Sequence, residues 1–229
     1  MADKVQLSEA DMLHSNAKYE ELVEFLKKLD QSDVEVQWRL TRALYDYSKL
    51  SANSGNKPDL VREAFDLIKN SLEKYDSHYA VHQWYAIMLD AKAHLDGLRA
   101  RIYVLEEIKQ HMEKAVELNP QDSISHYILG EFAFQVADLS WIEKKILSSV
   151  LTHPPACTYE EALGHFLKAE ELKAGFYNLN YLMIGKCYIA MKDNEKAKEY
   201  LIKASQVDLV SEDDKKCKEE GTKLLAKLK

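Results

Sequence analysis

Residues 181–205 carry apolar and small side chains at helical spacing on both sides of a short polar turn. Tyr181, the pair Ile184-Gly185 and Tyr188 recur at intervals of about three or four residues, which places them on one face of a helix. After the turn MKDNE, the same interval separates three further positions: Ala197, Leu201 and Ala204. This pattern is typical of a tetratricopeptide repeat, in which two antiparallel helices, A and B, span about 34 residues.

Earlier segments of the chain repeat parts of this pattern. Helix B spacing recurs at Ala162, Phe166 and Ala169, at Ile108, Met112 and Ala115, at Ala64, Ile68 and Ser71, and at Leu22, Leu26 and Leu29. The preceding A helices are marked by His126, Leu129-Gly130 and Ala133, by Trp84, Ile87, Met88 and Ala91, and by Trp38 and Tyr45. Three of these hairpins are longer than the template, so we expect lengthened helices or turns.

Local signals predict several helix boundaries. Pro58 lies near the start of the helix that ends around Leu72, a position that proline tolerates. Thr158 and Glu161 form a capping-box pattern that opens another helix. Because WIEKKILSSVL places its apolar residues on one helical face, we expect the A helix that contains His126 to continue to about Leu151, where HPP breaks it.

These patterns predict an all-α protein, a tetratricopeptide-like superhelix of about five antiparallel hairpins with lengthened helices. The chain has only 7 Gly and 4 Pro, which favours long helices joined by short connections. We expect residues 1–229 to form a single domain.

The order of four segments resembles the regulator of microtubule dynamics family. These segments are AVHQWYAIMLD, HMEKAVELNPQD, PPACTYEEALGHFLKAEELKAGFY and LNYLMIGKCYIAM, and the resemblance extends over roughly residues 35–225. It implies association with microtubules, the spindle and spindle poles, and a role in chromosome segregation. Several family members carry an N-terminal membrane anchor and lie at mitochondria. This sequence starts almost directly with the helical region, so we expect a soluble form without that anchor.

Composition narrows the classes of protein further. The formal net charge of −7 argues against a general nucleic-acid binder. The sequence contains no signal peptide and no apolar run long enough to span a membrane, so we expect a protein of the cytosol or nucleus. The resemblance implies a cytoplasmic location at the cytoskeleton, spindle and spindle poles. Cys157, Cys187 and Cys217 form no CxxC pair, so they are predicted to be free thiols, with Cys187 buried.

Candidate catalytic and metal-binding chemistry is sparse. His78 and His82 could share a helix face, but no HExxH motif or third ligand accompanies them, so surface or groove histidines are the expected interpretation. Neighbouring carboxylates such as Glu106-Glu107 diverge around a helix and do not converge on one atom. Motifs for phosphate cradles and serine nucleophiles are absent from the sequence. We expect no enzymatic activity, no cofactor and no metal.

The inner face of a helical-repeat superhelix is the expected binding surface, and the A helices line it. The repeat register points these residues toward that concave groove: Arg39, Tyr85, Lys92, Tyr127, Phe134, Leu182 and Lys186, with Arg42 nearby. A mixture of Tyr with Arg or Lys suits a protein partner. In the alternative interpretation, the lengthened helices fill the groove and leave Tyr127 and Phe134 in the core.

A second candidate surface is the basic C-terminal segment KKCKEEGTKLLAKLK. Leu224, Leu225 and Leu228 lie on one side of a helix, which predicts a cap over the last hairpin. The lysines surround this apolar side and could instead dock on an acidic surface such as tubulin or anionic lipid: Lys215, Lys216, Lys218, Lys223 and Lys227.

Together these observations favour a non-enzymatic binding protein that associates with microtubules, directly or through a spindle protein. Two alternatives remain at this stage. The groove could admit the acyl chain of a lipid ligand, or the domain could be a general scaffold for peptides of other proteins.

Overall fold

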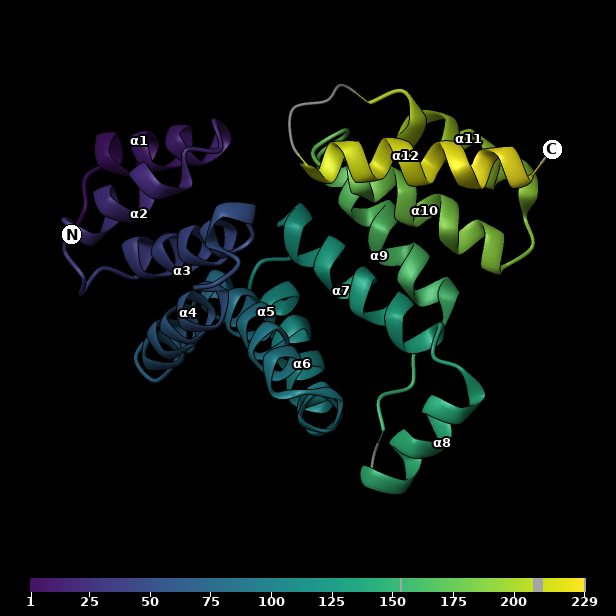
Figure 1. Cartoon of the computed structure of the whole chain (residues 1–229), viewed down its shortest axis with the longest axis horizontal. Helices are drawn as coiled ribbons and strands as arrows, with labels where there is room; N and C mark the ends of the chain where they lie inside the picture. The colour runs from purple at the N-terminus through teal and green to yellow at the C-terminus, as the bar shows by residue number, and fades with distance from the viewer. Residues whose placement is uncertain (153, 208–211, 229) are drawn as a thin grey trace. The chain divides into compact units, whose positions relative to one another are not determined.

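The computed structural model describes residues 1–152, 154–207 and 212–228. All regular elements in these ranges are helices, which confirms the all-α prediction (Figure 1). They form two compact units, Met1–Leu118 and Asn119–Lys229. The first unit contains α1 (Lys4–Ser15), α2 (Tyr19–Lys27), α3 (Val34–Ser48), α4 (Lys57–Leu72), α5 (Tyr79–Asp96) and α6 (Leu98–Leu118), with a short 3-10 turn at Ser51–Asn53. The second contains α7 (Ser123–Ala137), α8 (Trp141–Val150), α9 (Tyr159–Leu172), α10 (Asn178–Ala190), α11 (Asn194–Ser205) and α12 (Glu212–Lys227).

The helices pack as the predicted hairpins. In the first unit α1 pairs with α2, α3 with α4 and α5 with α6, and in the second α7 pairs with α9 and α10 with α11. The predicted helix B positions are buried except Leu29, which follows the end of α2 and is partly buried. Ile68, Phe166 and Leu201 are fully inaccessible to solvent. The spacing in the sequence therefore identified the faces on which the B helices pack.

A small residue lies at the same place in four A helices. Thr41, Ala86, Gly130 and Gly185 each lie eight positions after the N-cap of their helix and contribute a small side chain or none. A Cβ atom added to Gly185 would lie 2.8 Å from the side chain of Leu201, and one added to Gly130 would lie 3.0 Å from the ring of Phe166. The bulky residue of helix B therefore rests directly against the backbone of helix A.

This position corrects the predicted repeat register in the first two of these A helices. In α5 the small residue is Ala86, whereas the sequence pattern placed Met88 at the small position of the pair that matches Ile184-Gly185. In α3 the small residue is Thr41, and Leu40 takes the place of the large residue of that pair. The buried residues of α5 lie on most sides of the helix, so its apolar pattern does not single out one register.

The expected long helix through residues 123–151 is instead two helices. The α7 helix ends at Ala137, and Ser140 starts α8 with a capping box: Ser140 N donates to the Glu143 carboxylate at 2.7 Å, and Glu143 N donates to Ser140 Oγ at 3.3 Å. A capping box satisfies backbone groups that a continuous helix would pair internally, so it marks a helix start. The predicted capping box of Thr158 and Glu161 and the proline near the start of α4 are both confirmed.

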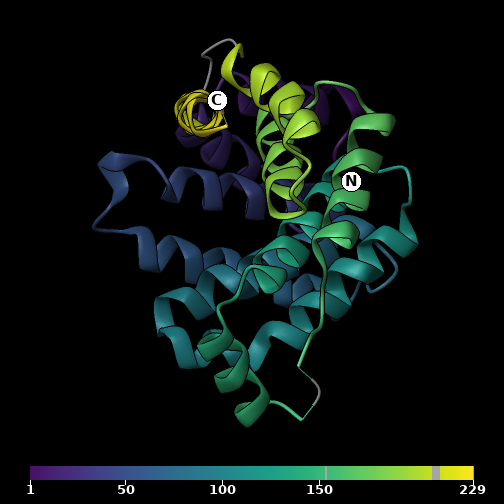
Figure 2. The same ribbon diagram turned by 90° about the vertical axis from the view of Figure 1, so that its right-hand side faces the viewer.

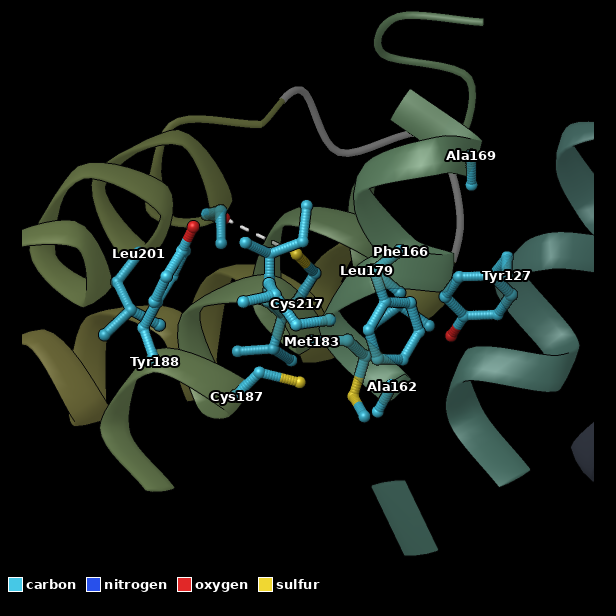
Figure 3. Packing of buried hydrophobic residues seen from close by; sticks show 14 of the residues in the cluster. Tyr127, Ala162, Phe166, Ala169, Leu179, Met183, Cys187, Tyr188, Leu201 and Cys217 are labelled. Carbon is cyan, nitrogen blue, oxygen red and sulfur yellow. Dashed lines mark hydrogen bonds between the residues drawn. The ribbon is translucent and has the colours of Figure 1, made fainter. Parts of the chain in front are cut away.

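The C-terminal helix covers the last hairpin, as the apolar side of its sequence predicted. Its Cys217 is fully buried in the core of the second unit (Figure 3), and Gly221 lies against Ala204 of α11. Leu224, Leu225 and Leu228 are partly buried against the same core. Figures 1 and 2 both show α12 alongside α10 and α11.

We predict that Gly185→Leu lowers the free energy of unfolding by roughly 1–3 kcal/mol, because the new side chain must displace Leu201. Gly164→Leu is the matched control, since Gly164 is a helical glycine with no atom within 4 Å of an added Cβ. There the substitution should be neutral or stabilise the helix by up to about 1 kcal/mol. Urea unfolding of both variants is the measurement, and equal effects would contradict the close approach at Gly185.

Candidate functional site

Three residues predicted to line a concave groove lie in the core instead. Tyr85, Tyr127 and Leu182 retain 7%, 5% and 1% of their exposure. The Tyr85 hydroxyl donates to Glu107 at 2.6 Å, and the Tyr127 ring lies 5.7 Å from that of Phe166 (Figure 3). Their burial offers a partner no surface, which corrects the groove prediction for these residues.

Three further predicted residues are partly buried and already engaged. The Phe134 ring lies 5.5 Å from that of Tyr159, so Phe134 packs within its unit, as the filled-groove alternative expected. Lys92 pairs with Asp96 one turn away at 2.9 Å, and Lys186 pairs with Glu220 and so links α10 to α12. The lysines therefore contribute to contacts within the fold.

Arg39 and Arg42 of α3 meet a carboxylate from α1. The Asp11 carboxylate accepts from Nε and Nη2 of Arg39 at 3.1 and 2.9 Å, and from Nη2 of Arg42 at 3.0 Å. Arg39 also donates to Glu35, and its guanidinium lies 4.2 Å from the ring centre of Trp38. We call Arg39, Arg42 and Trp38 the arginine site. The two arginines, which were predicted to lie in or near the groove, are instead mostly covered, and an acidic side chain of the same chain contacts both.

The residues of the arginine site stabilise the charged forms of the two acids that contact them, Asp11 and Glu35. Burial acts to raise the pKa of Asp11, but hydrogen bonds from Arg39 and Arg42 hold that pKa below its ordinary value. A hydrogen bond with His78, together with those from Arg39 and Trp38, lowers the pKa of Glu35 to about 2 despite partial burial. The Nε of Arg42 is buried and has no hydrogen-bond partner among the described residues.

The predicted C-terminal lysines remain on the surface. Lys215, Lys216, Lys218, Lys223 and Lys227 are all exposed. Lys216, Lys223 and Lys227 recur at helical spacing and share one side of α12, away from Cys217 and the leucines. We call these three residues the lysine stripe. The helix thus combines an apolar inner side with an exposed side that carries the lysine stripe beside acids such as Glu219.

An exposed apolar surface appears on α8, which projects from its unit in Figures 1 and 2. Trp141, Ile142 and Ile146 are 74%, 64% and 42% exposed, and Leu147 is the one buried residue of this helix. Exposed apolar clusters of this kind are typical of interaction surfaces. The sequence placed these side chains on one face but did not show that the face is uncovered.

The histidines form pairs that the sequence did not predict. His82 of α5 and His111 of α6 bring their Nδ1 atoms within 2.7 Å, and His126 of α7 and His165 of α9 do so at 3.3 Å. His78 lies elsewhere, 3.0 Å from Glu35, so His78 and His82 do not form a two-histidine site. Among the described residues, no three His, Cys, Asp or Glu side chains are arranged to hold a metal ion.

The backbone assigns the tautomers of the first pair. The carbonyl of Asp76 can only accept, so Nε2 of His82 donates to it at 2.6 Å. The Nδ1 of neutral His82 then accepts from Nδ1–H of His111. Burial, followed by the neighbouring His82, lowers the pKa of His111.

Neither buried cysteine resembles a reactive nucleophile. Cys187 is fully buried as predicted, and burial raises the pKa of its thiol to about 12. Burial also raises the pKa of Cys217 to about 11. Reactive thiols need a lowered pKa and access to solvent, so these two side chains serve packing.

The lowered pKa of His111 predicts a pH dependence of stability. The unfolded chain binds a proton first as pH falls through about 6.5, so the folded state should lose stability below that pH. We expect the wild type to lose more unfolding free energy between about pH 8 and pH 5.5 than His111→Asn does. His94→Asn, which replaces an exposed histidine of α5, should lose as much as the wild type. An equal loss in the wild type and His111→Asn would contradict this assignment.

Comparisons with known proteins agree with the helical repeat and identify the family. The family model described as "Regulator of microtubule dynamics protein 1-3" matches residues 6–229. The chain is 38% identical to regulator of microtubule dynamics protein 1 of Bos taurus over 221 residues, which cover 96% of this chain and 70% of that protein. It is also 38% identical to the Mus musculus protein 1 over 224 residues, covering 97% of this chain and 73% of the relative.

Among solved structures, a thermophilic TPR protein of Thermus thermophilus matches with a TM-score of 0.65. The match covers 98% of this chain and 100% of that one at 14% identity, and it therefore concerns the fold alone. Of the described helices, none is long and apolar enough to cross a lipid bilayer. On the family model and these relatives, the chain belongs to the regulator of microtubule dynamics protein 1-3 family.

Proposed function

We propose that this chain is a non-enzymatic, microtubule-associated binding protein that acts in spindle organisation and chromosome segregation. The observation that carries the proposal is the family match across residues 6–229, with relatives named as regulators of microtubule dynamics. Its place of action would be the cytoplasm, at microtubules and spindle poles.

The lysine stripe of α12 is the contact that we assign to tubulin. Tubulin surfaces are strongly acidic, and the net charge of −7 opposes non-specific attraction to them. Direct binding must therefore use a local basic surface, and Lys216, Lys223 and Lys227 offer exposed ammonium groups on one side of a helix. The buried opposite side holds α12 on its unit, so the stripe is presented on an ordered support.

The lipid alternative has less support than the microtubule proposal. It relied on Tyr- and Leu-bearing A helices that would line an acyl-chain groove. Tyr85, Tyr127 and Leu182 pack in the core, and the rings of Tyr127 and Tyr177 lie 4.8 Å apart. Native mass spectrometry of the purified protein would detect a bound lipid and so would favour the alternative.

We predict that Lys216→Glu/Lys223→Glu/Lys227→Glu loses most co-sedimentation with polymerised tubulin. Increasing salt should weaken wild-type binding, because the Debye length falls from about 10 Å at 0.1 M to about 3 Å at 1 M. The matched control is Lys57→Glu/Lys69→Glu/Lys74→Glu, which makes the same change in net charge at exposed lysines of the first unit.

The control variant should bind like the wild type at each salt concentration. If both variants lost co-sedimentation equally, the change in net charge alone would explain the loss, and this result would contradict the role of the lysine stripe. If the wild type does not sediment with microtubules even at low salt, direct tubulin contact is excluded and recruitment through a spindle protein becomes the remaining form of the proposal.

A further inference from the structure

The helix α1 is attached to the first unit by one small, fully buried side chain, by partly buried leucines and by several polar contacts. Ala10 is its one fully buried residue, Leu7 and Leu13 are partly buried, and Val5 and Met12 are 75% and 59% exposed. Besides Asp11, His14 contacts α3 through Asp46 at 3.0 Å, and the backbone N–H of Ala2 donates to Asp33 at 2.7 Å. Because Ala10 is the one side chain of α1 that is fully buried, and it is small, we expect α1 to be easier to displace than a helix that buries several large apolar side chains.

The other terminal helix shows what an apolar attachment looks like in the same chain. The inner side of α12 includes fully buried Cys217 and the partly buried Leu224, Leu225 and Leu228. Burial of apolar area contributes about 25 cal/mol per Å², and salt does not screen it. At α1, ion pairs of Asp11 and His14 with α3 act beside the apolar contacts.

The Asp11 carboxylate occupies the arginine site as a ligand would. It accepts two hydrogen bonds from Arg39 and one from Arg42, while its own side chain is 46% exposed. The arginine side chains are only 11% and 15% exposed, so α1 and α3 cover most of both groups. Planar guanidinium groups bind carboxylates in this forked manner.

If α1 withdrew, the guanidinium groups of the arginine site would have more hydrogen-bond donors than the remaining acids could accept from. Arg39 would keep Glu35, which is also fixed by His78 and Trp38. Arg42 would lose Asp11, and its Nε already has no hydrogen-bond partner among the described residues. Asp46 also attracts Arg42; on withdrawal Asp46 would lose His14 but would keep Lys49, with which it pairs at 3.1 Å. The uncovered guanidinium groups would then need a new carboxylate.

We propose that the arginine site binds an acidic peptide segment of a partner protein, and that α1 competes with this segment through Asp11. The proposal rests on the proposed function, because it concerns how a microtubule-associated protein would engage an acidic partner. A carboxylate-bearing peptide is favoured over nucleic acid, since the occupant in the structure is a carboxylate and the net charge is −7. An internal competitor lowers the apparent affinity for an external peptide, because only the molecules in which α1 has left the arginines can bind that peptide.

The test measures binding of a fluorescein-labelled deca-glutamate peptide to the full chain by fluorescence anisotropy. Asp11→Ala should bind at least about fivefold more tightly than the wild type, because it removes the internal ligand. Glu9→Ala is the matched control: Glu9 is an exposed acid on the same helix, so its substitution changes the charge of α1 equally without touching the arginines. Its affinity should stay within about twofold of the wild type.

Two further arms locate the site on the arginines. Adding Arg39→Gln/Arg42→Gln to Asp11→Ala should abolish the gain, with circular dichroism reporting whether the triple variant folds. Independently of that variant, a synthetic peptide of residues 1–18 should compete with deca-glutamate for the Asp11→Ala protein. The same peptide with Asp11 replaced by Ala should not compete.

Equal gains in Asp11→Ala and Glu9→Ala, or no gain in Asp11→Ala, would overturn the proposal. A gain of the same size with labelled oligo-dT in place of deca-glutamate would overturn the assignment to a peptide.

Microtubule co-sedimentation of the same variants separates this inference from the proposed function. If microtubules bind equally well to all variants and Asp11→Ala shows no peptide gain, the proposed function stands and this inference fails. If the peptide arms succeed but microtubules never bind, the inference stands and direct tubulin contact fails.

Discussion

The close approach of helix A to helix B is the constraint on which the described structure depends. At Gly130 and Gly185 the bulky residue of the partner helix rests on the backbone, and an added Cβ would lie 3.0 Å or less from it. Thr41 and Ala86 are fully buried at the equivalent positions of α3 and α5. Because protein interiors are close-packed, this contact determines which side chains on the rest of each hairpin can be buried. The hairpins tolerate the inserted α8 between α7 and α9 because the insertion does not interrupt that contact.

The same packing limits the surface that the predicted groove residues can offer to a partner. Large A-helix residues that could have lined a groove, such as Tyr127 and Leu182, fill the space beside the small positions. The two basic sites considered for a partner lie on α12 and on α3 beneath α1. The lysine stripe is exposed on α12, and the arginine site lies beneath Asp11 of α1. One basic surface is therefore open, and the other is closed by an acid of the same chain.

Local sequence signals predicted most of the fold. The small–bulky–small spacing of helix B is directly visible in the sequence, and the capping box of Thr158 and Glu161 needs only residues three apart. The prediction failed where several registers or boundaries satisfied the apolar pattern, as in α5 and at the junction of α7 and α8. The candidate site was less predictable, because the state of Arg39 depends on Asp11, 28 residues earlier in the chain. An alignment of A helices by N-cap could have found the paired histidines, since His82 and His126 both lie four positions after it.

The central claim is that ion pairs contribute more to the attachment of α1 than to that of α12. Hydrogen–deuterium exchange of the full chain at about 0.05 M and about 0.5 M salt tests it most directly, because salt screens ion pairs at partly exposed sites and leaves apolar burial intact. The account predicts that amides of Lys4–Ser15 exchange several-fold faster at high salt, while those of α12 around Cys217 and Gly221 keep their rates. Equal salt responses of the two helices, or an α1 that stays protected at high salt, would contradict it.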